Sequence, residues 1–327
     1  MRKLRRGSFV ILLFALAAFI GCNSNTGSKD KKLKIAVIPK GTTHQFWQSV
    51  HYGAKQAADK YGVEIFWSGP PKEDNRTDQI AVVENFVTRG VDGICLAPLD
   101  ARGLVSAVKS AKQEGIPSVI FDSGLDSPES IVSYVATDNA NGGALAAREL
   151  GKLLGGKGRV ILFRYAIGSE STEQREQGFL DALAKEFPDI KVISQDQYAG
   201  ATAESALTVA QNLLTSLGAQ TDGIFAVNES CAMGMLQALR DANLAGKVKF
   251  IGFDTSDKMI AALKSGDMQG LVLQDPVKMG FTAVETLVKH LRGEKVEARI
   301  ATGELLATPA NMEEPSVKER LQPPHLK

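Results

Sequence analysis

The residues best suited to chemistry lie in short polar segments that follow apolar, β-branched runs. Five of the six segments carry Asp, Asn or Gln within their first two positions. The oxygens of these side chains accept hydrogen bonds, and the carboxamides also donate them. The first segment carries Phe46 and Trp47, which offer flat apolar faces. Such a mixture suits a ligand with many hydroxyl groups. The segments are 40–47, 122–124, 137–139, 228–230, 254–256 and 274–275.

Helix capping explains part of this pattern, because Asp, Asn, Ser and Thr commonly cap helix N-termini. A set that recurs at the ends of many strands is harder to explain by caps alone. Phe46 and Trp47 begin a helical pattern, and two adjacent aromatic residues cannot both face inward on one helix. We therefore expect one of them to face a cleft or the surface.

The runs that precede these segments have the character of strands. Several are apolar on consecutive positions, as expected for strands covered on both faces. The predicted strands are 33–38, 63–67, 93–97, 118–121, 132–136, 159–163, 223–227, 249–252 and 270–273. The helical patterns between them are 45–61, 77–90, 101–115, 139–155, 172–187, 202–217, 229–243, 256–266 and 276–292.

Repeated strand-then-helix units imply parallel sheets with helices on both faces. About nine such units exceed one compact sheet of modest size, so we predict two α/β lobes. In open parallel sheets, ligands sit outside the carboxyl ends of the strands. The polar segments lie at those ends, which makes them the candidate binding site.

The N-terminal residues have the pattern of an export signal. Four basic residues precede an apolar stretch of about 12, which is shorter than the roughly 20 residues of a membrane span. Phe-Ile-Gly-Cys at 19–22 resembles a bacterial lipobox, in which the chain is cut before Cys22 and that thiol is lipidated. A plain signal peptide before an incidental cysteine is the alternative. We predict a signal peptide over 1–21 and a lipidated flexible tether over 22–32.

Composition excludes several classes of protein. The chain has 327 residues, 44% of them hydrophobic and 23% charged, which excludes collagen-like, coiled-coil and wholly disordered proteins. A net charge of +1 gives no pull toward nucleic acid, and a single long apolar run excludes a multi-span transporter. Cys95 and Cys231 are expected to be buried thiols, although a bond between them stays open.

Motifs for catalysis are scarce. His44 lies in a strand-end segment, but no Gly-x-Ser-x-Gly elbow accompanies it. Phosphate loops, dinucleotide fingerprints and zinc-spaced clusters are absent from the sequence. Asp122 and Asp254 as an acid–base pair is the weaker interpretation. We expect a protein that is not an enzyme and needs no cofactor or metal.

Taken together, the motifs resemble the ribose-type periplasmic sugar-binding proteins of ABC importers. These share the type I periplasmic-binding-protein fold with LacI-like regulators. The resemblance covers nearly all of 33–303. It rests on Lys-Ile-Ala-Val-Ile at 34–38, Phe-Trp at 46–47 with Gly-Ala at 53–54, Ala-Pro at 97–98, Ile-Pro at 116–117, Phe-Asp at 121–122, the segment 136–143, Arg-Glu-Gln-Gly-Phe at 175–179, Ala-Val-Asn-Glu at 226–229, Gly-Phe-Asp at 252–254 and Leu-Gln-Asp-Pro at 273–276.

The resemblance implies which residues contact the ligand. The positions that match the family's ligand contacts are Phe46, Trp47, Asp122, Arg175, Asn228, Asp254 and Gln274. Ser123 stands where the ribose-binding pattern has Arg, and His44-Gln45 replaces Asn-Pro. These departures change the available donors, so a larger or differently configured monosaccharide, a modified sugar or a polyol fits as well as ribose. We add Ser123, His44 and Asn139 to the candidate ligand-binding residues.

The resemblance also implies two lobes that close around a sugar by hinge motion. We place three hinge crossings near Thr137, Gln274 and Gly303. An ABC permease and its ATPase would be the partners of a monomer on the extracytoplasmic face of the cell envelope, held to the membrane by its N-terminal lipid alone. The predicted N-terminal lobe holds 33–137 and 275–303, and the C-terminal lobe with its tail holds 138–274 and 304–327.

Three other functions remain to be weighed. A lipid-anchored sensor of a chemotaxis or signalling receptor would bind its sugar identically. A LacI-type regulator needs an N-terminal helix-turn-helix of about 60 residues, and the signal peptide occupies that place. A secreted carbohydrate enzyme would release a product from the sugar.

Overall fold

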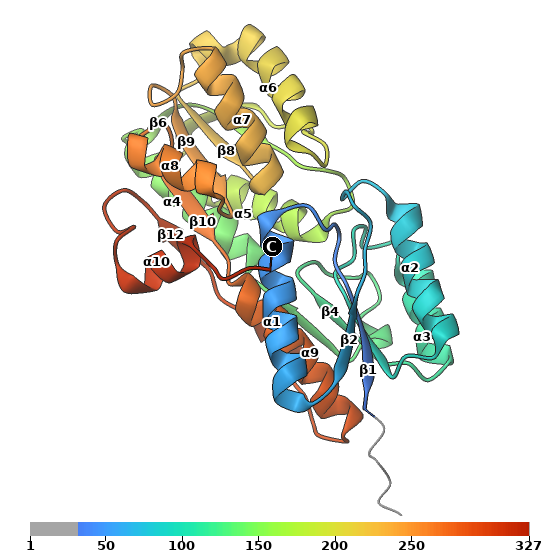
Figure 1. The fold of residues 1–327 in the computed structure, drawn as a ribbon. Coiled ribbons are helices and arrows are strands. Elements are labelled where there is room, and N and C mark those ends of the chain that lie inside the picture. The colour runs from blue at the N-terminus through green and yellow to red at the C-terminus, as the bar shows by residue number, and fades with distance from the viewer. Residues whose placement is uncertain (1–31, 327) are drawn as a thin grey trace, which may run out of the picture. The chain divides into compact units, whose positions relative to one another are not determined.

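The computed structural model describes residues 32–326. The predicted signal peptide, residues 22–31 of the tether and the lipidation of Cys22 lie outside these residues. Within them, strands and helices alternate and build two α/β lobes, each around its own six-stranded sheet (Figure 1). The predicted fold class is therefore confirmed.

The N-terminal lobe is built on a sheet of order β11-β5-β4-β3-β1-β2, in which every pair is parallel. Alternate strand residues join two cores, one under α1 and α9 and the other under α2 and α3. The strands are β1 (Lys34–Ile38), β2 (Glu64–Trp67), β3 (Gly93–Leu96), β4 (Ser118–Phe121), β5 (Ser133–Ala136) and β11 (Arg299–Ala301). The helices are α1 (Gln45–Tyr61), α2 (Arg76–Arg89), α3 (Val105–Gln113) and α9 (Pro276–Leu291).

The C-terminal lobe repeats this plan with the order β12-β10-β9-β8-β6-β7. Its one departure from the predicted parallel sheets is β12, which pairs antiparallel with β10. The strands are β6 (Lys157–Phe163), β7 (Asp189–Ser194), β8 (Gly223–Ala226), β9 (Lys249–Phe253), β10 (Gly270–Leu273) and β12 (Leu305–Ala307). The helices are α4 (Asn139–Leu153), α5 (Glu170–Glu186), α6 (Ala203–Leu217), α7 (Glu229–Asp241), α8 (Asp257–Ser265) and α10 (Pro315–Leu321).

The chain passes between the two sheets in three short segments, 137–138, 274–275 and 302–304. The helix that follows each of the first two passages packs in the lobe it enters, α4 against α5 and α9 against α1. All the carboxyl ends of the central strands therefore point toward the boundary between the lobes, where the polar segments meet.

The tail beyond β12 is ordered against the body of the protein. Val317 and Leu321 of α10 are buried in the core of the C-terminal lobe. The Thr255 hydroxyl donates a hydrogen bond to the Leu321 carbonyl at 2.9 Å. Leu326 donates its backbone N–H to the Gln48 carbonyl of α1, in the other lobe. The tail thus contacts both lobes near the second passage.

Two further features of the described residues bear on the sequence analysis. None of the helices within 32–326 combines the length and apolar character that a membrane span requires. Cys95 on β3 and Cys231 on α7 are both buried and unpaired, so the structure contains no bond between them.

Candidate functional site

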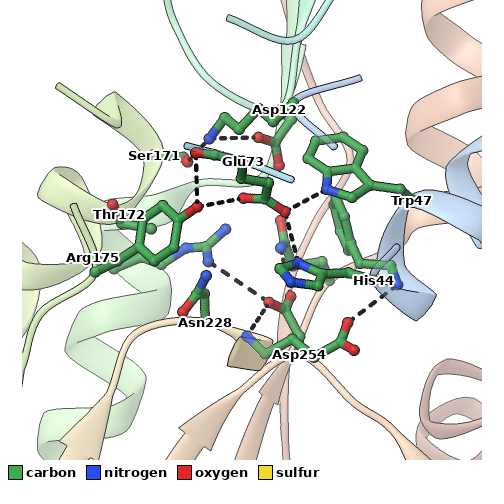
Figure 2. Close-up of a pocket in the computed structure, with 14 residues that line it drawn as sticks. His44, Trp47, Glu73, Asp122, Ser171, Thr172, Arg175, Asn228 and Asp254 are labelled. Carbon is green, nitrogen blue, oxygen red and sulfur yellow. Dashed lines mark hydrogen bonds and ion pairs between the residues drawn. The ribbon is translucent and has the colours of Figure 1, made fainter. Parts of the chain in front are cut away.

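A small cavity lies between the carboxyl ends of the two sheets and is lined from both lobes (Figure 2). Of the predicted ligand-binding residues, those that line the cavity are His44, Phe46, Trp47, Asp122, Arg175, Asn228, Asp254 and Gln274. The lining residues that the sequence analysis did not select are Lys40, Glu73, Tyr165, Ser171, Thr172 and Glu229.

Asp122 and Asp254 occupy equivalent positions, each directly after a central strand of its sheet. Both have left-handed backbone conformations, with φ of 63° and 69°, which Asp tolerates better than most residues. Their N–H groups donate to Val135 and Val272 of the neighbouring strands at 3.0 and 2.8 Å. This turn aims each carboxylate away from the sheet and into the cavity.

The Lys40 ammonium is the cation of the N-terminal side of the site. Its Nζ lies 3.1 Å from Asp122 Oδ2. Nζ also donates to the hydroxyls of Ser169 and Ser171, at 3.2 and 3.0 Å, in the opposite lobe. These three acceptors use all three ammonium donors, so Lys40 both pairs with the carboxylate and bridges the lobes.

Arg175 is the cation of the C-terminal side. Its Nε donates to Asn139 Oδ1 and its Nη1 to the Val227 carbonyl, both at 2.9 Å. The guanidinium lies 3.7 Å from the ring centroid of Phe253, and Nη1 is 4.0 Å from Asp254 Oδ2. Asn139 therefore sits behind Arg175 rather than on the cavity surface. Its Nδ2 is buried without a partner within the described residues.

Asp254 is held by several donors at once. Gln274 Nε2 donates to Oδ1 at 2.7 Å, and the Glu229 backbone N–H donates to Oδ2 at 3.1 Å. Burial raises the pKa of Asp254, and the charge of Arg175 offsets only part of that rise. The Thr137 hydroxyl donates to Gln274 Oε1 at 2.6 Å, which links the first two interlobe passages directly behind the site.

Phe46 and Trp47 form the aromatic wall of the cavity. Their ring centroids are 4.8 Å apart in an edge-to-face arrangement at 82°. Both residues line the cavity, where we expected one of them to face a cleft or the surface. Trp47 also packs edge-to-face on Phe121, at 6.3 Å, so its ring belongs to the core and to the site at once.

Glu73 is the hub of a buried cluster beside this wall. Its carboxylate accepts hydrogen bonds from Trp47 Nε1 at 2.6 Å and from the Tyr165 hydroxyl at 2.8 Å. His44 Nδ1 lies 2.7 Å away. Burial alone would raise the pKa of Glu73, but the charge of His44 lowers it to about 2. Burial likewise opposes protonation of His44, yet Glu73 raises its pKa to about 9.

Glu229 reaches across the cavity boundary from the first residue of α7. Its two carboxylate oxygens lie 3.4 and 3.3 Å from the backbone nitrogens of Gln45 and Phe46, which donate to them. The side chain of His44, the N-cap of α1, makes no capping bond, so Glu229 fills that role from the other lobe. Burial raises the pKa of Glu229 to about 7.

Ser123 is buried behind the cavity lining. Its hydroxyl accepts the backbone N–H of Ser171 at 3.0 Å. It therefore contributes a contact between the lobes. Because Ser123 is smaller than the Arg of the ribose-binding pattern, Lys40 is the cation beside Asp122. Lys40 was not among the predicted ligand-binding residues.

The other residues were selected because they are polar and follow the carboxyl end of a strand. The same rule also applies to Lys40, Glu229 and Glu73. Each follows the carboxyl end of a strand, namely β1, β8 and β2. Lys40 and Glu229 even lie in the segments 40–47 and 228–230 that the rule examined. Applying the rule to the segment after every strand would have included all three.

The arrangement suits reversible binding of a hydroxyl-rich molecule. Three cations and four carboxylates line the cavity, most of them paired, beside carboxamides and hydroxyls that both donate and accept. Within residues 32–326, no group of His, Cys, Asp and Glu is arranged to hold a metal ion.

Comparison with known proteins places the chain in a family. The family model described as "Periplasmic binding protein domain" matches residues 35–295. The ribose import binding protein RbsB of Haemophilus influenzae is 30% identical over 301 residues, which cover 92% of this chain and 97% of that protein. RbsB of Escherichia coli is 31% identical, over 88% and 94% of the two chains.

Solved structures show the same relationship. A carbohydrate transporter solute-binding protein from Agrobacterium radiobacter, in complex with D-arabinose, is 35% identical with a TM-score of 0.85, over 90% of this chain and 100% of that one. An ABC transporter solute-binding protein from Agrobacterium vitis with bound D-fucose is 37% identical with a TM-score of 0.85, over 88% and 100%. The chain therefore belongs to the ribose-type periplasmic sugar-binding proteins of ABC importers, which have the type I periplasmic-binding-protein fold.

Proposed function

We propose that this protein captures a neutral monosaccharide or related polyol between its lobes and delivers it to an ABC importer. The observation that carries this proposal is the convergence of Asp122, Asp254, Arg175 and the aromatic wall on one small cavity. Polar groups of both lobes can bond the hydroxyls of one ligand, while Phe46 and Trp47 cover its apolar C–H face.

The charges of the cavity favour a neutral ligand. Lys40 pairs with Asp122, and His44 pairs with Glu73, before any ligand is present. A carboxylate or phosphate on the ligand would meet Asp254 and Asp122 with little free cation to offset it. An unpaired buried charge is costly, so sugar acids and sugar phosphates are expected to bind weakly.

Closure of the cleft supplies the signal to the importer. We propose that 33–137 with 275–303, and 138–274 with 304–327, move as two lobes about the three passages. Lys40, Glu73 and Glu229 each bond to the opposite lobe, and these contacts define the closed form. A ligand that bridges the lobes stabilises this form, which presents a composite surface to a permease and ATPase.

The relatives suggest a short panel of candidate ligands. Two of them are named for ribose and xylitol, and solved structures contain D-arabinose, D-fucose, D-allose and myo-inositol. In this protein Lys40 is the cation beside Asp122, and Ser123 lies behind the cavity lining. We therefore expect this protein to rank the panel in an order of its own, with ribose not necessarily first.

We further propose that the protein is an exported monomeric lipoprotein, anchored through Cys22. Support comes from the charged and apolar regions of residues 1–21 and the lipobox-like segment that ends them. Expressing Cys22→Ser in a bacterial host with a lipoprotein pathway is expected to move the protein from the membrane fraction to the soluble extract. Continued tight membrane association of that variant would contradict the anchor.

Titration calorimetry and X-ray scattering of the chain from residue 23 onward test sugar binding. D-Ribose, D-arabinose, D-fucose, D-allose, xylitol and myo-inositol form the neutral panel, with D-glucuronate and ribose 5-phosphate as charged controls. We expect binding heat, a raised melting temperature and compaction with at least one neutral compound, and none with the charged ones. Absence of heat and compaction across the neutral panel, or tighter binding of the charged controls, would contradict the proposal.

A further inference from the structure

We propose that Glu73 is a positioning residue that couples the aromatic wall to closure of the lobes. This inference rests on the proposed function, because closure matters only if a ligand is captured between the lobes. One carboxylate from the N-terminal lobe orients Trp47 and His44 beside the cavity (Figure 2). The same carboxylate accepts a hydrogen bond from the Tyr165 hydroxyl of the C-terminal lobe.

Within its own lobe, Glu73 fixes two rings that flank the ligand. Trp47 Nε1 donates to Oε1 at 2.6 Å, which sets the rotation of the indole plane about the α1 backbone. His44 Nδ1 lies 2.7 Å from the same oxygen. Hydrogen bonds to an ionised group are roughly twice as strong as neutral ones, so this carboxylate holds both rings more firmly than packing would.

Across the boundary, Glu73 receives a single donor. The Tyr165 hydroxyl, from the segment after β6, donates to Oε2 at 2.8 Å, and Tyr165 is buried with 2% of its surface exposed. Separation of the lobes removes this bond and returns both groups to water. Oε1 therefore positions Trp47 and His44 beside the ligand, and Oε2 bonds to Tyr165 in the closed form. One carboxylate thus links the orientation of these rings to closure of the lobes.

The backbone makes room for this carboxylate. Glu73 lies between β2 and α2, in a segment with two adjacent prolines. A Cβ on Gly41 would lie 2.8 Å from the Glu73 Cγ, so a larger residue at 41 would displace the side chain. Gly41 follows Lys40 directly in the segment after β1, and its lack of a side chain leaves room for Glu73.

Electrostatics keep the hub ionised in the neutral range. Lys40 faces Glu73 along with His44, and both lower its pKa, which settles at about 2 against the effect of burial. His44 faces Glu73, Glu229 and Asp254, and their charges outweigh burial to bring its pKa to about 9. Glu204 of α6 also faces His44. The pair is thus charged from about pH 3 to pH 8.

The first test needs no sugar. Histidine NMR titration of the free protein is expected to find His44 with a pKa near 9, and Glu73→Gln is expected to bring it toward the ordinary value of about 6.5. Asp74→Asn, at the exposed acid next in sequence, serves as the matched control and should leave His44 unchanged. A His44 pKa that stays near 9 in Glu73→Gln would overturn the pairing.

The second test reads the aromatic wall and closure together, with the panel sugar that binds the wild type most tightly. In a Trp67→Phe background, Glu73→Gln is expected to shift the Trp47 emission in the free protein and to weaken binding about tenfold or more. Tyr165→Phe is expected to speed sugar release a few-fold and to leave the free-protein emission unchanged. Asp74→Asn should match the wild type in both measurements.

The two variants should also be coupled. If Glu73 Oε2 stabilises the closed form through Tyr165, then adding Tyr165→Phe to Glu73→Gln should cause little further loss of sugar affinity. Unaltered affinity in Glu73→Gln, with a lowered His44 pKa, would reduce Glu73 to a structural residue and overturn the inference. Fully additive losses would overturn the coupling.

The pH profile of binding gives a third readout. Because the His44 pKa is raised, its ion pair contributes fully below about pH 6.5 and is lost as pH rises through about 9. The affinity advantage of the wild type over Glu73→Gln should therefore persist to about pH 8 and shrink as pH rises through about 9. Glu229, whose pKa is about 7, titrates in both proteins and cancels in this difference. Failure of the proposed function is distinct, because then the wild type itself binds no sugar of the panel.

Discussion

The two lobes share one scaffold and differ in the chemistry they bring to the cavity. Their strand orders correspond one to one, and Asp122 and Asp254 follow equivalent strands in the same left-handed conformation. Each lobe also packs two helices through glycines at close range. A Cβ at Gly53 would lie 1.9 Å from the Val277 carbonyl oxygen, and one at Gly178 would lie 2.0 Å from the Ala140 carbonyl oxygen.

The glycines give a register for comparing the lobes. Counting back the same number of residues from Gly53 and Gly178 pairs the aromatic wall with Ser171 and Thr172, and pairs Val50 with Arg175. The N-terminal lobe thus offers an apolar face where the C-terminal lobe offers hydroxyls and a guanidinium. The repeated backbone sets the positions, and the side chains set which face of a sugar each lobe meets.

The ion pairs differ in the same way. The Lys40 ammonium divides its bonds between Asp122 and the serines of the opposite lobe. Arg175 is held by Asn139 and the Val227 carbonyl within its own lobe. Under the proposed closure, the C-terminal half of the site would therefore be assembled before the lobes close, and the N-terminal half would be completed by closure.

The largest expected effect separates these two cations. Arg175→Ala should weaken sugar binding by about 3–5 kcal/mol in calorimetry, because the sugar loses this donor and is held against Asp254 without its cation. Lys40→Ala should cost less, about 1–2 kcal/mol, because the pair of Lys40 with Asp122 lies within one lobe and is lost from the free protein as well. Mainly the lost bonds to the two serines of the opposite lobe then count toward sugar binding. Arg240→Ala, which breaks the surface pair with Asp267, is the control. Equal losses for Lys40 and Arg175 would contradict the asymmetry.

The shared scaffold is tested by its glycines. Gly53→Ala and Gly178→Ala should each destabilise the protein by about 3 kcal/mol in urea unfolding, because the new methyl overlaps backbone atoms of the partner helix. Gly62→Ala, at a helix end with φ of 68° and no atom within 4 Å, should cost about 1 kcal/mol. If only one of these two substitutions destabilised the protein, the helix packing of the two lobes would not be equivalent.

Glu229 gives a smaller effect that depends on pH. Its pKa is raised from 4.5 to about 7, so its contribution to stability is present below about pH 4.5 and is lost as pH rises through about 7. Glu229→Gln removes this loss. The difference in unfolding free energy between variant and wild type should then shift by about 1–2 kcal/mol in favour of the variant between pH 5 and pH 8.

The control for this pH dependence is the exposed Glu186. Glu186→Gln should change unfolding stability in parallel with the wild type across the same range, apart from its surface pair with Arg148. If the unfolding free energy of Glu229→Gln also followed that of the wild type at every pH, burial would not disfavour the charged form of Glu229.

The fold was largely predictable because its signals are local. Consecutive apolar residues marked strands such as β4 and β10, and three- and four-residue spacing marked α1 and α9. Three strands were not predicted. β7 is an edge strand with a mixed burial pattern, and β11 and β12 have only three residues each, whose pairing depends on the lobes and not on their own pattern. Pro315 starts the short α10, which sits in a proline- and charge-rich tail without a periodic pattern.

The site was predictable where function follows from position along a strand. Asp122 and Asp254 were selected in this way, and the structure places both at the cavity. Glu73 also follows a strand, but its partners Trp47 and Tyr165 are 26 and 92 residues away, so its role between them arises only from three-dimensional packing. Arg175 lies inside a helix, and only the family resemblance drew attention to it.

The smallest effect concerns one hydroxyl of the pair that faces the aromatic wall. Ser171→Ala removes an acceptor from Lys40 and is expected to weaken sugar binding by about 1 kcal/mol or less, mainly through faster release. The control is Thr215→Ala, which removes an exposed hydroxyl on α6 that bonds only its own helix in the described structure. Because the bond belongs to Lys40 as well, the double variant should bind no more weakly than Lys40→Ala alone. If the losses of sugar affinity from Ser171→Ala and Lys40→Ala were additive, Ser171 would contact the ligand directly. Its hydroxyl would then belong to the sugar site and not to the contact with Lys40 between the lobes.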